Sequence, residues 1–282
     1  MTFTEFAQSY GLIIDYIQPS DRVFRCGTES KPNSKNGAYK FDGTFGWISD
    51  WSNGGDVIYY NNPESTGFTP EQKREYAKNK YQQELKIQEQ YQEAAKKSLQ
   101  ALKKAILSTH HYLNSKGLPD TLGLVDEGIL LVPMRSLETN KLQGMQSIEW
   151  IDGGWTKKMY PGMKAKGSVL RLGNKQSKET FLVEGYATGL SVEMAVRRLC
   201  LDASVMVCFS DSNMVYVASM LKGDNIFVIA DNDESKAGEK AAIKTGFPWI
   251  MSSNIGEDAN DLMNNYGIMA LCSLIMKIRK KT

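Results

Sequence analysis

The final third of the chain alternates short apolar runs with segments whose apolar residues have helical spacing. The apolar runs lie at 180–185, 204–210 and 225–231, and each is short enough to be a buried strand. An amphipathic segment follows each of them, and one more short run lies at 248–253. This order predicts an α/β domain over residues 179–282, in which a parallel sheet is flanked by helices.

Two different patterns precede this domain. Residues 1–62 contain short aromatic runs broken by Gly, Asn, Ser and Asp, which predicts a small β-rich module. Residues 63–117 predict a helical linker, because Thr69 and Pro70 are typical of a helix start and no Gly or Pro follows until after residue 107. The apolar stripe expected along this helix comprises Ile87, Tyr91, Ala94, Ala95, Leu99, Leu102 and Ile106.

Residues 118–178 predict a basic subdomain. Two strand-like runs, 128–135 and 142–150, are joined by a polar turn and predict a hairpin. From residue 153 to residue 178 there are seven basic residues and no Asp or Glu, whereas residues 179–261 contain thirteen acidic and six basic residues. A basic segment beside an acidic one suits an enzyme that holds polyphosphate and metal ions, although a solvated lysine-rich surface gives the same pattern.

The composition is that of an ordinary soluble globular protein. Of the 282 residues, 41% are hydrophobic and 23% are charged, and the net charge is +2. No segment approaches the roughly 18 apolar residues of a membrane span, and the first residues lack the pattern of a secretory signal. The four cysteines have no CxxC spacing. We therefore expect a cytoplasmic protein with reduced thiols and no membrane partner.

Carboxylates follow the predicted strands. Glu184 ends one run, Asp231 and Asp233 end another, and Asp258 and Asp261 follow the last. The carboxyl ends of parallel strands meet at one edge of a sheet, where ligands bind. Carboxylates gathered there repel each other unless a cation neutralises them, and Mg²⁺ or Mn²⁺ would do so and support phosphoryl transfer. The alternative is that each residue is a loop or helix-cap residue.

The same motifs resemble the Toprim domain of primases, topoisomerases and some nucleases. VEGYATGLSVEMAV, CFSDSNM, VIADNDESKAGEKAA and GEDANDLMNNYG occur in the family's order over residues 179–265, and the fuller likeness is to plasmid- and phage-type primases. This resemblance implies that Glu184 is a metal ligand or general base and that Asp231 and Asp233 bind metal. Asp258 and Asp261 are likened to the last acidic motif. Thr188 stands where replicative primases have Asp, so the second metal's ligands are in doubt.

The segment upstream resembles the basic subdomain of a primase core. LLVPMR, LQGMQ and KKMYPGMKAKG follow the order of that subdomain's strand, glycine turn and lysine-bearing loop. By this likeness basic side chains face template phosphates or the incoming triphosphate. The candidate nucleotide- and DNA-binding residues are Arg135, Lys157, Lys158, Lys164, Lys166, Arg171 and Lys240.

The N-terminal module also resembles the start of these primases, where many relatives carry a zinc ribbon. A tetrahedral zinc site needs about four Cys or His ligands at tight spacing, and this module has only Cys26, so we expect no zinc. The module could still bind DNA by stacking bases on aromatic side chains, or those side chains could form its core. The aromatic candidates are Trp47, Trp51, Tyr59 and Tyr60.

Together these features predict a DNA primase. It would make short RNA primers on single-stranded DNA from ribonucleoside triphosphates, by two-metal-ion nucleotidyl transfer in phage or plasmid replication. No GxxxxGK[ST] motif occurs, so any replicative helicase would be a separate chain. The alternatives are a Toprim-type metal-dependent nuclease and a catalytically inactive accessory protein that binds single-stranded DNA. A topoisomerase is disfavoured, because no companion domain with a tyrosine nucleophile is evident.

Overall fold

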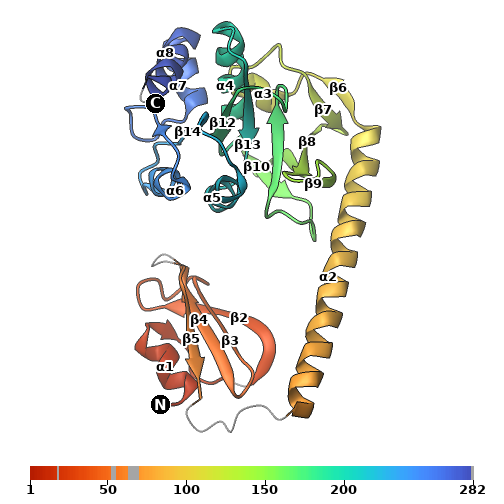
Figure 1. The fold of residues 1–282 in the computed structure, drawn as a ribbon, viewed down its shortest axis with the longest axis vertical. Helices are drawn as coiled ribbons and strands as arrows, with labels where there is room; N and C mark the ends of the chain where they lie inside the picture. Colours follow the sequence, from red (N-terminus) through yellow and green to blue (C-terminus); the bar gives the residue numbers. More distant parts are fainter. Residues whose placement is uncertain (18, 52–54, 63–69, 281–282) are drawn as a thin grey trace. The chain divides into compact units, whose positions relative to one another are not determined.

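The computed structural model describes residues 1–17, 19–51, 55–62 and 70–280 (Figure 1). These residues form two compact units, residues 1–80 and 81–282. The division falls within one long helix, α2 (Pro70–Lys104). Each unit has its own sheet and its own hydrophobic core.

The first unit is a five-stranded antiparallel sheet with one helix. The strands follow in chain order across the sheet: β1 (Leu12–Ile13), β2 (Ser20–Thr28), β3 (Gly37–Phe41), β4 (Phe45–Asp50) and β5 (Val57–Asn61). The predicted β-rich character of this region is confirmed. The helix α1 (Phe3–Ser9) was not predicted; Thr2 and Glu5 close a capping box at its start. Its Phe3 and Phe6 pack in the core with Ile48 and Tyr60 of the sheet.

The aromatic candidates of this unit divide between core and surface. Tyr60 is only 7% exposed and belongs to the core, as the core interpretation predicted for it, whereas the neighbouring Tyr59 is 74% exposed. Trp47 lies directly across from Tyr59 in the β4–β5 ladder, on the face that α1 does not cover. Trp51 is also exposed, and the guanidinium of Arg25 lies 4.5 Å from its ring centre.

The helix α2 confirms the long helix read from the sequence, but its contact face differs from the predicted stripe. The helix ends at Lys104, and Ile106 belongs to a short strand, β6 (Ile106–Ser108). Ala94 and Ser98 are buried, whereas Ile87 and Leu99 are exposed. Helical spacing defines a stripe on the helix, but the tertiary partner decides which part of it is covered. The proposed cap residue Thr69 lies outside the described residues.

The second unit contains one sheet of ten strands. Its main path runs β10 (Gly154–Met159), β9 (Leu142–Ile151), β8 (Ile129–Ser136), β11 (Ser168–Leu172), β13 (Ala203–Val207), β12 (Glu179–Val183), β14 (Ile226–Ile229) and β15 (Trp249–Ile250). The remaining pair is β6 with β7 (Gly123–Asp126), which joins the sheet at β8. The first short helix of this unit is α3 (His111–Ser115).

This sheet is mixed rather than wholly parallel. The strands β13, β12, β14 and β15 are parallel neighbours, as the strand–helix alternation predicted. The predicted hairpin is also present as the antiparallel pair β8–β9. The strand β11 pairs antiparallel with β8 on one edge and with β13 on the other. The basic strands and the parallel strands therefore form one continuous sheet, which the division at residue 179 did not anticipate.

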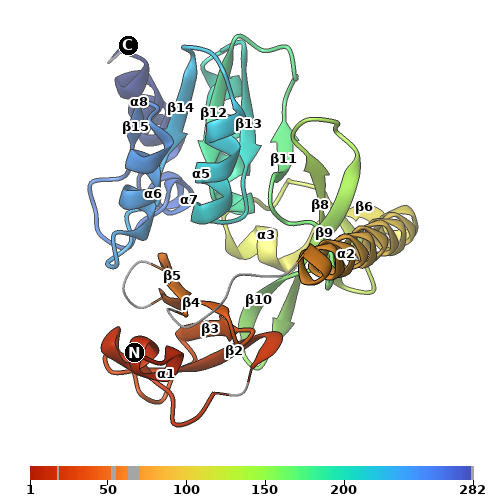
Figure 2. The ribbon, with the colours of Figure 1, turned by 60° about the horizontal axis from the view of Figure 1, so that its bottom comes forward.

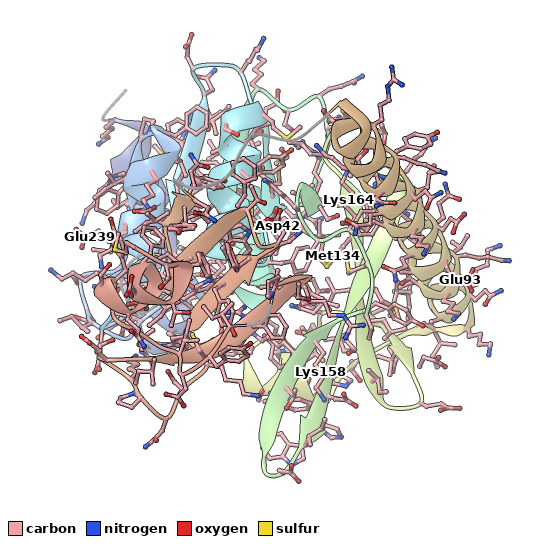
Figure 3. The ribbon with its side chains drawn as sticks, turned by 90° about the horizontal axis from the view of Figure 1, so that it is seen from below. Asp42, Glu93, Met134, Lys158, Lys164 and Glu239 are labelled. Carbon is pink, nitrogen blue, oxygen red and sulfur yellow. The ribbon has the colours of Figure 1, made fainter. Side chains whose placement is uncertain are left out.

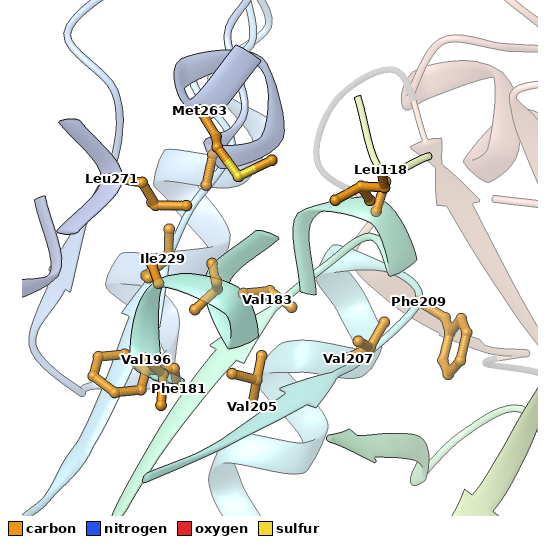
Figure 4. Packing of buried hydrophobic residues seen from close by; sticks show 14 of the residues in the cluster. Leu118, Phe181, Val183, Val196, Val205, Val207, Phe209, Ile229, Met263 and Leu271 are labelled. Carbon is orange, nitrogen blue, oxygen red and sulfur yellow. The ribbon is translucent and has the colours of Figure 1, made fainter. Parts of the chain in front are cut away.

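Helices cover both faces of the parallel strands (Figures 1 and 2). On one face lie α4 (Tyr186–Arg198), α7 (Ala259–Tyr266) and α8 (Ile268–Arg279). On the other lie α5 (Asp211–Met220) and α6 (Ala237–Thr245). Successive strand residues alternate between the faces: Phe181 and Val183 pack under α4 and α8, and Leu182 packs under α5 and α6. Figure 4 shows the first of these cores, with Phe181 beside Val205.

Candidate active site

The carboxylates collect where the parallel strands end. Glu184 directly follows β12, Asp231 follows β14 by two residues, and Asp211 begins α5 shortly after β13. Because the three strands are parallel neighbours, their carboxyl ends lie at one edge of the sheet. The charge of Asp211 raises the pKa values of both Glu184 and Asp231, which places the three side chains in one electrostatic site.

Glu184 and Asp211 form a carboxyl pair. Their side chains share a hydrogen bond. Burial, followed by the charges of Asp211 and Asp231, raises the pKa of Glu184 to about 8, and burial also raises the pKa of Asp211. The shared hydrogen bond raises the pKa of Glu184 and lowers that of Asp211, so Glu184 is the proton donor within the pair.

Asp231 is the most enclosed carboxylate of the site. Burial, followed by the charges of Asp258 and Asp211, raises the pKa of Asp231 to about 7. Its Oδ1 is buried and, among the described residues, has no hydrogen-bond partner; the same holds for Oδ1 of Asp211. Buried oxygens without a partner cost free energy unless another group satisfies them. These two atoms are the positions at which a cation would be most favourable.

Asp233 lies at the start of α6 and is held by it. Its Oδ2 accepts a hydrogen bond of 2.8 Å from the Gly238 amide, and its Oδ1 accepts from the Ala237 amide and from the Ser235 hydroxyl. Burial raises its pKa, but these hydrogen bonds outweigh burial and lower the pKa to about 2. Asp233 is therefore always ionised at neutral pH.

A glycine lets α6 approach the carboxyl end of β14 closely. A Cβ at position 238 would lie 2.3 Å from the carbonyl oxygen of Asp231, so any larger residue there would push the helix away. Gly238 thus lets α6 lie against the backbone of Asp231 while its amide holds the Asp233 carboxylate.

The last acidic motif is attached to the same edge through Asn232. Its backbone forms a bridge with Glu257, and its side-chain amide donates to the Ser252 carbonyl at 3.0 Å. Asp258 then caps α7: its Oδ1 accepts from the Asn260 and Asp261 amides, and its Oδ2 accepts from the Thr188 hydroxyl at 3.1 Å. Thr188, the departure from replicative primases, therefore points at Asp258.

Asp261 has contacts of another kind. Its Oδ2 accepts from the Asp258 amide, which completes the capping box, and its Oδ1 lies 3.9 Å from the Lys116 ammonium. Both oxygens are thus engaged in holding the start of α7.

The basic candidates are spread over several places. Lys157 is the one whose charge lowers the pKa values of Glu184 and Asp231, and its ammonium lies 5.5 Å from the Tyr112 ring centre. Lys158, next to it on β10, points elsewhere and lies 3.9 Å from Glu149 (Figure 3). Lys164 and Lys166 follow β10 and line cavities beside α5.

The three remaining basic candidates lie on β8, β11 and α6. Arg171 on β11 donates to the Ser204 hydroxyl, and burial lowers its pKa. It lines a small cavity together with Arg135, which donates to the Asn140 carbonyl. Lys240 is exposed on α6.

The donor set fits a hard divalent cation. It consists of carboxylates, two of which have unpartnered buried oxygens and pKa values raised by burial and then by neighbouring carboxylates. No three Asp, Glu, His or Cys side chains of the described residues already form a complete ligand group. Mg²⁺ does not need one, because it usually takes one or two carboxylates and completes its shell with water and substrate phosphates.

Asp211 is the residue that sequence reasoning missed. The motif CFSDSNM was read as a strand and the turn after it, and an Asp in such a turn suggests only a helix start. The signal that could have found it is positional: like Glu184 and Asp231, it follows a strand of the parallel set at the carboxyl edge.

Comparison with known families supports this interpretation of the fold. The family model of the Toprim domain matches residues 179–268. The predicted Toprim region is therefore confirmed, and the chain contains a domain that occurs in primases, nucleases and topoisomerases and that typically binds Mg²⁺. A search of curated proteins returned no relative that matches. No helix of the described residues is long and apolar enough to cross a membrane.

Proposed function

We propose that this protein is a DNA primase that joins ribonucleotides on a single-stranded DNA template. The observation that carries the proposal is the continuous sheet, in which β10 brings Lys157 to the carboxylates of the Toprim domain. A cation beside a metal-binding edge suits a triphosphate whose charge must be neutralised on two sides. The likeness of residues 130–167 to the basic subdomain of primases supports the same assignment.

The roles follow from the state of each carboxylate. Asp231, Asp233 and Asp258 would hold Mg²⁺ or Mn²⁺, with the unpartnered Oδ1 of Asp231 as a principal ligand. Such an ion lowers the pKa of an attacking hydroxyl and neutralises phosphate charge. Asp261 would orient Asp258 through the capping box rather than bind the ion.

Glu184, hydrogen-bonded to Asp211, would accept the proton that the attacking hydroxyl loses. When the pair is ionised, Glu184 accepts the proton of the primer 3′-hydroxyl, whose oxygen forms a bond to the α-phosphorus. The bond from that phosphorus to the bridging oxygen breaks, and pyrophosphate leaves. Asp211 would also replace the carboxylate that replicative primases have at the position of Thr188. The unpartnered Oδ1 of Asp211 would then serve as a metal ligand.

The basic residues would form two groups that bind different phosphates. Lys157, Lys164 and Lys166 would contact the triphosphate, and Arg135, Lys158, Arg171 and Lys240 would contact the template backbone. Contacts to phosphates neutralise charge and release counterions, so template affinity should fall steeply with salt. A phage or plasmid replication system, a separate helicase and a cytoplasmic setting, drawn from the resemblance and from the composition, complete the proposal.

The test is a primer-synthesis assay on mixed-sequence single-stranded DNA with labelled ribonucleotides and Mg²⁺ or Mn²⁺. The wild type should make short labelled RNA, and Asp231→Asn should make none. Asp224→Asn is the matched control, because it is the same change at an exposed residue just before the same strand. Metal-dependent shortening of the DNA, without RNA, would instead identify a nuclease. DNA binding that needs no metal, with neither product, would identify an inactive accessory protein.

A further inference from the structure

A cavity of about 620 Å³ lies beside α5, and apart from Lys166 its lining residues have no role in the chemistry proposed so far. Its walls are largely apolar and come from Met159, Ala165, Val215 and Tyr216. Ser210 and Ser212 also line it and add polar groups. This combination of size, apolar walls and a few polar groups is that of a small-molecule site.

A buried asparagine holds the cavity in shape. The Asn213 amide nitrogen donates to the Ser168 carbonyl at 2.8 Å and to the Cys208 carbonyl at 2.7 Å, and its Oδ1 accepts from the Gly167 amide at 2.7 Å. These bonds tie the start of α5 to the segment between β10 and β11. The two walls of the cavity are therefore fixed to one another before any ligand binds, which lowers the entropic cost of binding.

Residues that line the cavity are sequence neighbours of a carboxylate at the sheet edge. Ser210 and Ser212, which line the cavity, flank Asp211, whose carboxyl shares a hydrogen bond with Glu184. A ligand with an apolar part in the cavity and a phosphate chain at its rim would thus direct its phosphates to the acidic site.

The chemistry of the walls suits a heteroaromatic ring. Tyr216 offers an aromatic surface and Met159 a thioether, and both pack well against flat rings. The ammonium of Lys166, which also lines the cavity, lies 4.4 Å from the Tyr216 ring centre. Ring stacking is tolerant of base identity, as an enzyme that copies any template requires.

We propose that this cavity binds the nucleoside of the incoming nucleoside triphosphate, with the base against Tyr216 and the triphosphate directed past Lys166 to the carboxylates. This inference rests on the proposed function, because it assumes that a nucleotide is the substrate. It adds a subsite for the base and ribose, which neither the family match nor the acidic motifs assign.

The experiment compares two probes by isothermal titration calorimetry in Mg²⁺: non-hydrolysable α,β-methylene ATP and inorganic tripolyphosphate. The wild type should bind the nucleotide more tightly than tripolyphosphate. Tyr216→Ala should weaken nucleotide binding about 10-fold, since stacking contributes roughly 1–3 kcal/mol per base. Tripolyphosphate affinity should stay the same, and Tyr216→Phe should bind the nucleotide as the wild type does.

A second variant guards against a folding defect, because Tyr216 is partly buried. Ala165→Phe fills the cavity and leaves Tyr216 in place, and it should also weaken the nucleotide alone. Equal nucleotide affinity in the wild type, Tyr216→Ala and Ala165→Phe would overturn the cavity proposal while leaving the primase intact. A loss of oligodeoxynucleotide affinity without a loss of nucleotide affinity would also overturn it and assign the cavity to the template. A wild type that binds neither probe would overturn the proposed function as well.

Discussion

The two sheets of this protein are covered differently. In the first unit, α1 packs on one face, and the other face carries Trp47 and the exposed Tyr59. In the second unit, helices pack on both faces of the parallel strands, and every residue of β14 is buried. The first sheet can therefore present the side chains of alternate residues along its strands, whereas the covered parallel strands of the second can present functional side chains only beyond their ends.

This difference explains where the unusual residues lie. In the doubly covered part of the second sheet, the candidate carboxylates lie at the carboxyl edge, where burial and then neighbouring carboxylates raise the pKa of Asp231. In the singly covered sheet, the unusual residues are aromatic rings on a face, with Arg25 beside Trp51. The sheet that helices cover on both faces thus has a candidate catalytic edge, whereas the sheet covered on one face has a candidate stacking surface.

The largest expected effect is a loss of activity on substitution at the carboxyl edge of the second sheet. If Asp231 is a metal ligand of a primase, as proposed above, Asp231→Asn should lower primer synthesis at least about 1,000-fold, which corresponds to roughly 4 kcal/mol of transition-state stabilisation. Mn²⁺ affinity, measured by titration, should fall in parallel. Template affinity in the absence of metal should stay the same or rise, since a negative charge is lost. Retained synthesis would place the chemistry away from the carboxyl edge.

The next effect is a pH dependence of stability that only the second unit should show. The pKa of Asp231 is raised from 3.8 to about 7 on folding, so the folded state binds the proton more tightly than the unfolded chain. Stability is therefore greatest below about pH 4 for this group and is lost as pH rises to about 7, by up to roughly 4 kcal/mol at about 1.4 kcal/mol per unit.

Thermal melting between pH 5 and pH 8, with and without Mg²⁺, measures this loss. Saturating Mg²⁺ should flatten the pH profile, because the ion binds the ionised carboxylates of the folded state. Asp231→Asn should melt higher than the wild type at pH 8 without metal. A wild-type profile that rises with pH in the absence of metal would contradict the repulsion described here.

Adjacent tyrosines test the coverage of the first sheet. Tyr60→Ala should destabilise the first unit by about 3 kcal/mol, as large-to-small changes of buried aromatic residues do. Tyr59→Ala, at the neighbouring exposed residue, should change stability by less than about 0.5 kcal/mol. Denaturant unfolding followed by tryptophan fluorescence separates the two variants. If single-stranded DNA stacks on this face, Tyr59→Ala should weaken oligodeoxynucleotide binding, although its fold is unchanged.

The smallest effect concerns an ion pair that joins α8 to the start of β12 in the second sheet. Arg279 at the end of α8 donates from Nε and Nη2 to the two carboxylate oxygens of Glu179, at 2.8 and 2.7 Å. Arg279→Ala should destabilise the second unit by about 1–2 kcal/mol, because the bond is bidentate and partly buried. Lys277→Ala, an exposed cation on the same helix, should have almost no effect. Equal melting temperatures for both variants would show that the pair adds nothing.

Much of the second unit could be predicted because its signals are local. Phe181, Leu182 and Val183 form an apolar run that ends in Glu184, and that order alone predicts a buried strand with a carboxylate at its end. The long helix α2 is equally local, since it depends on helix-forming residues and the absence of Gly and Pro.

The features that were not predicted depend on tertiary partners. The seven residues of α1 contain two phenylalanines, which suit a strand as well as a helix until the sheet beneath them is known. The five residues of β11 gain their place from pairing on both edges, and no local pattern specifies those partners. The carboxyl of Asp211 acquires its role only because β13 lies beside β12.

The strand β11 also has a consequence for how the second unit opens. Its backbone is hydrogen-bonded to β8 on one side and to β13 on the other, so it cannot separate from one neighbour without breaking the sheet in two. Its amides should exchange with deuterated solvent only when the whole unit unfolds, at the slowest rate in that unit. The basic strands and the Toprim strands would then move as one foldon, and any change of shape on ligand binding would fall to the connecting segments rather than to a hinge in the sheet.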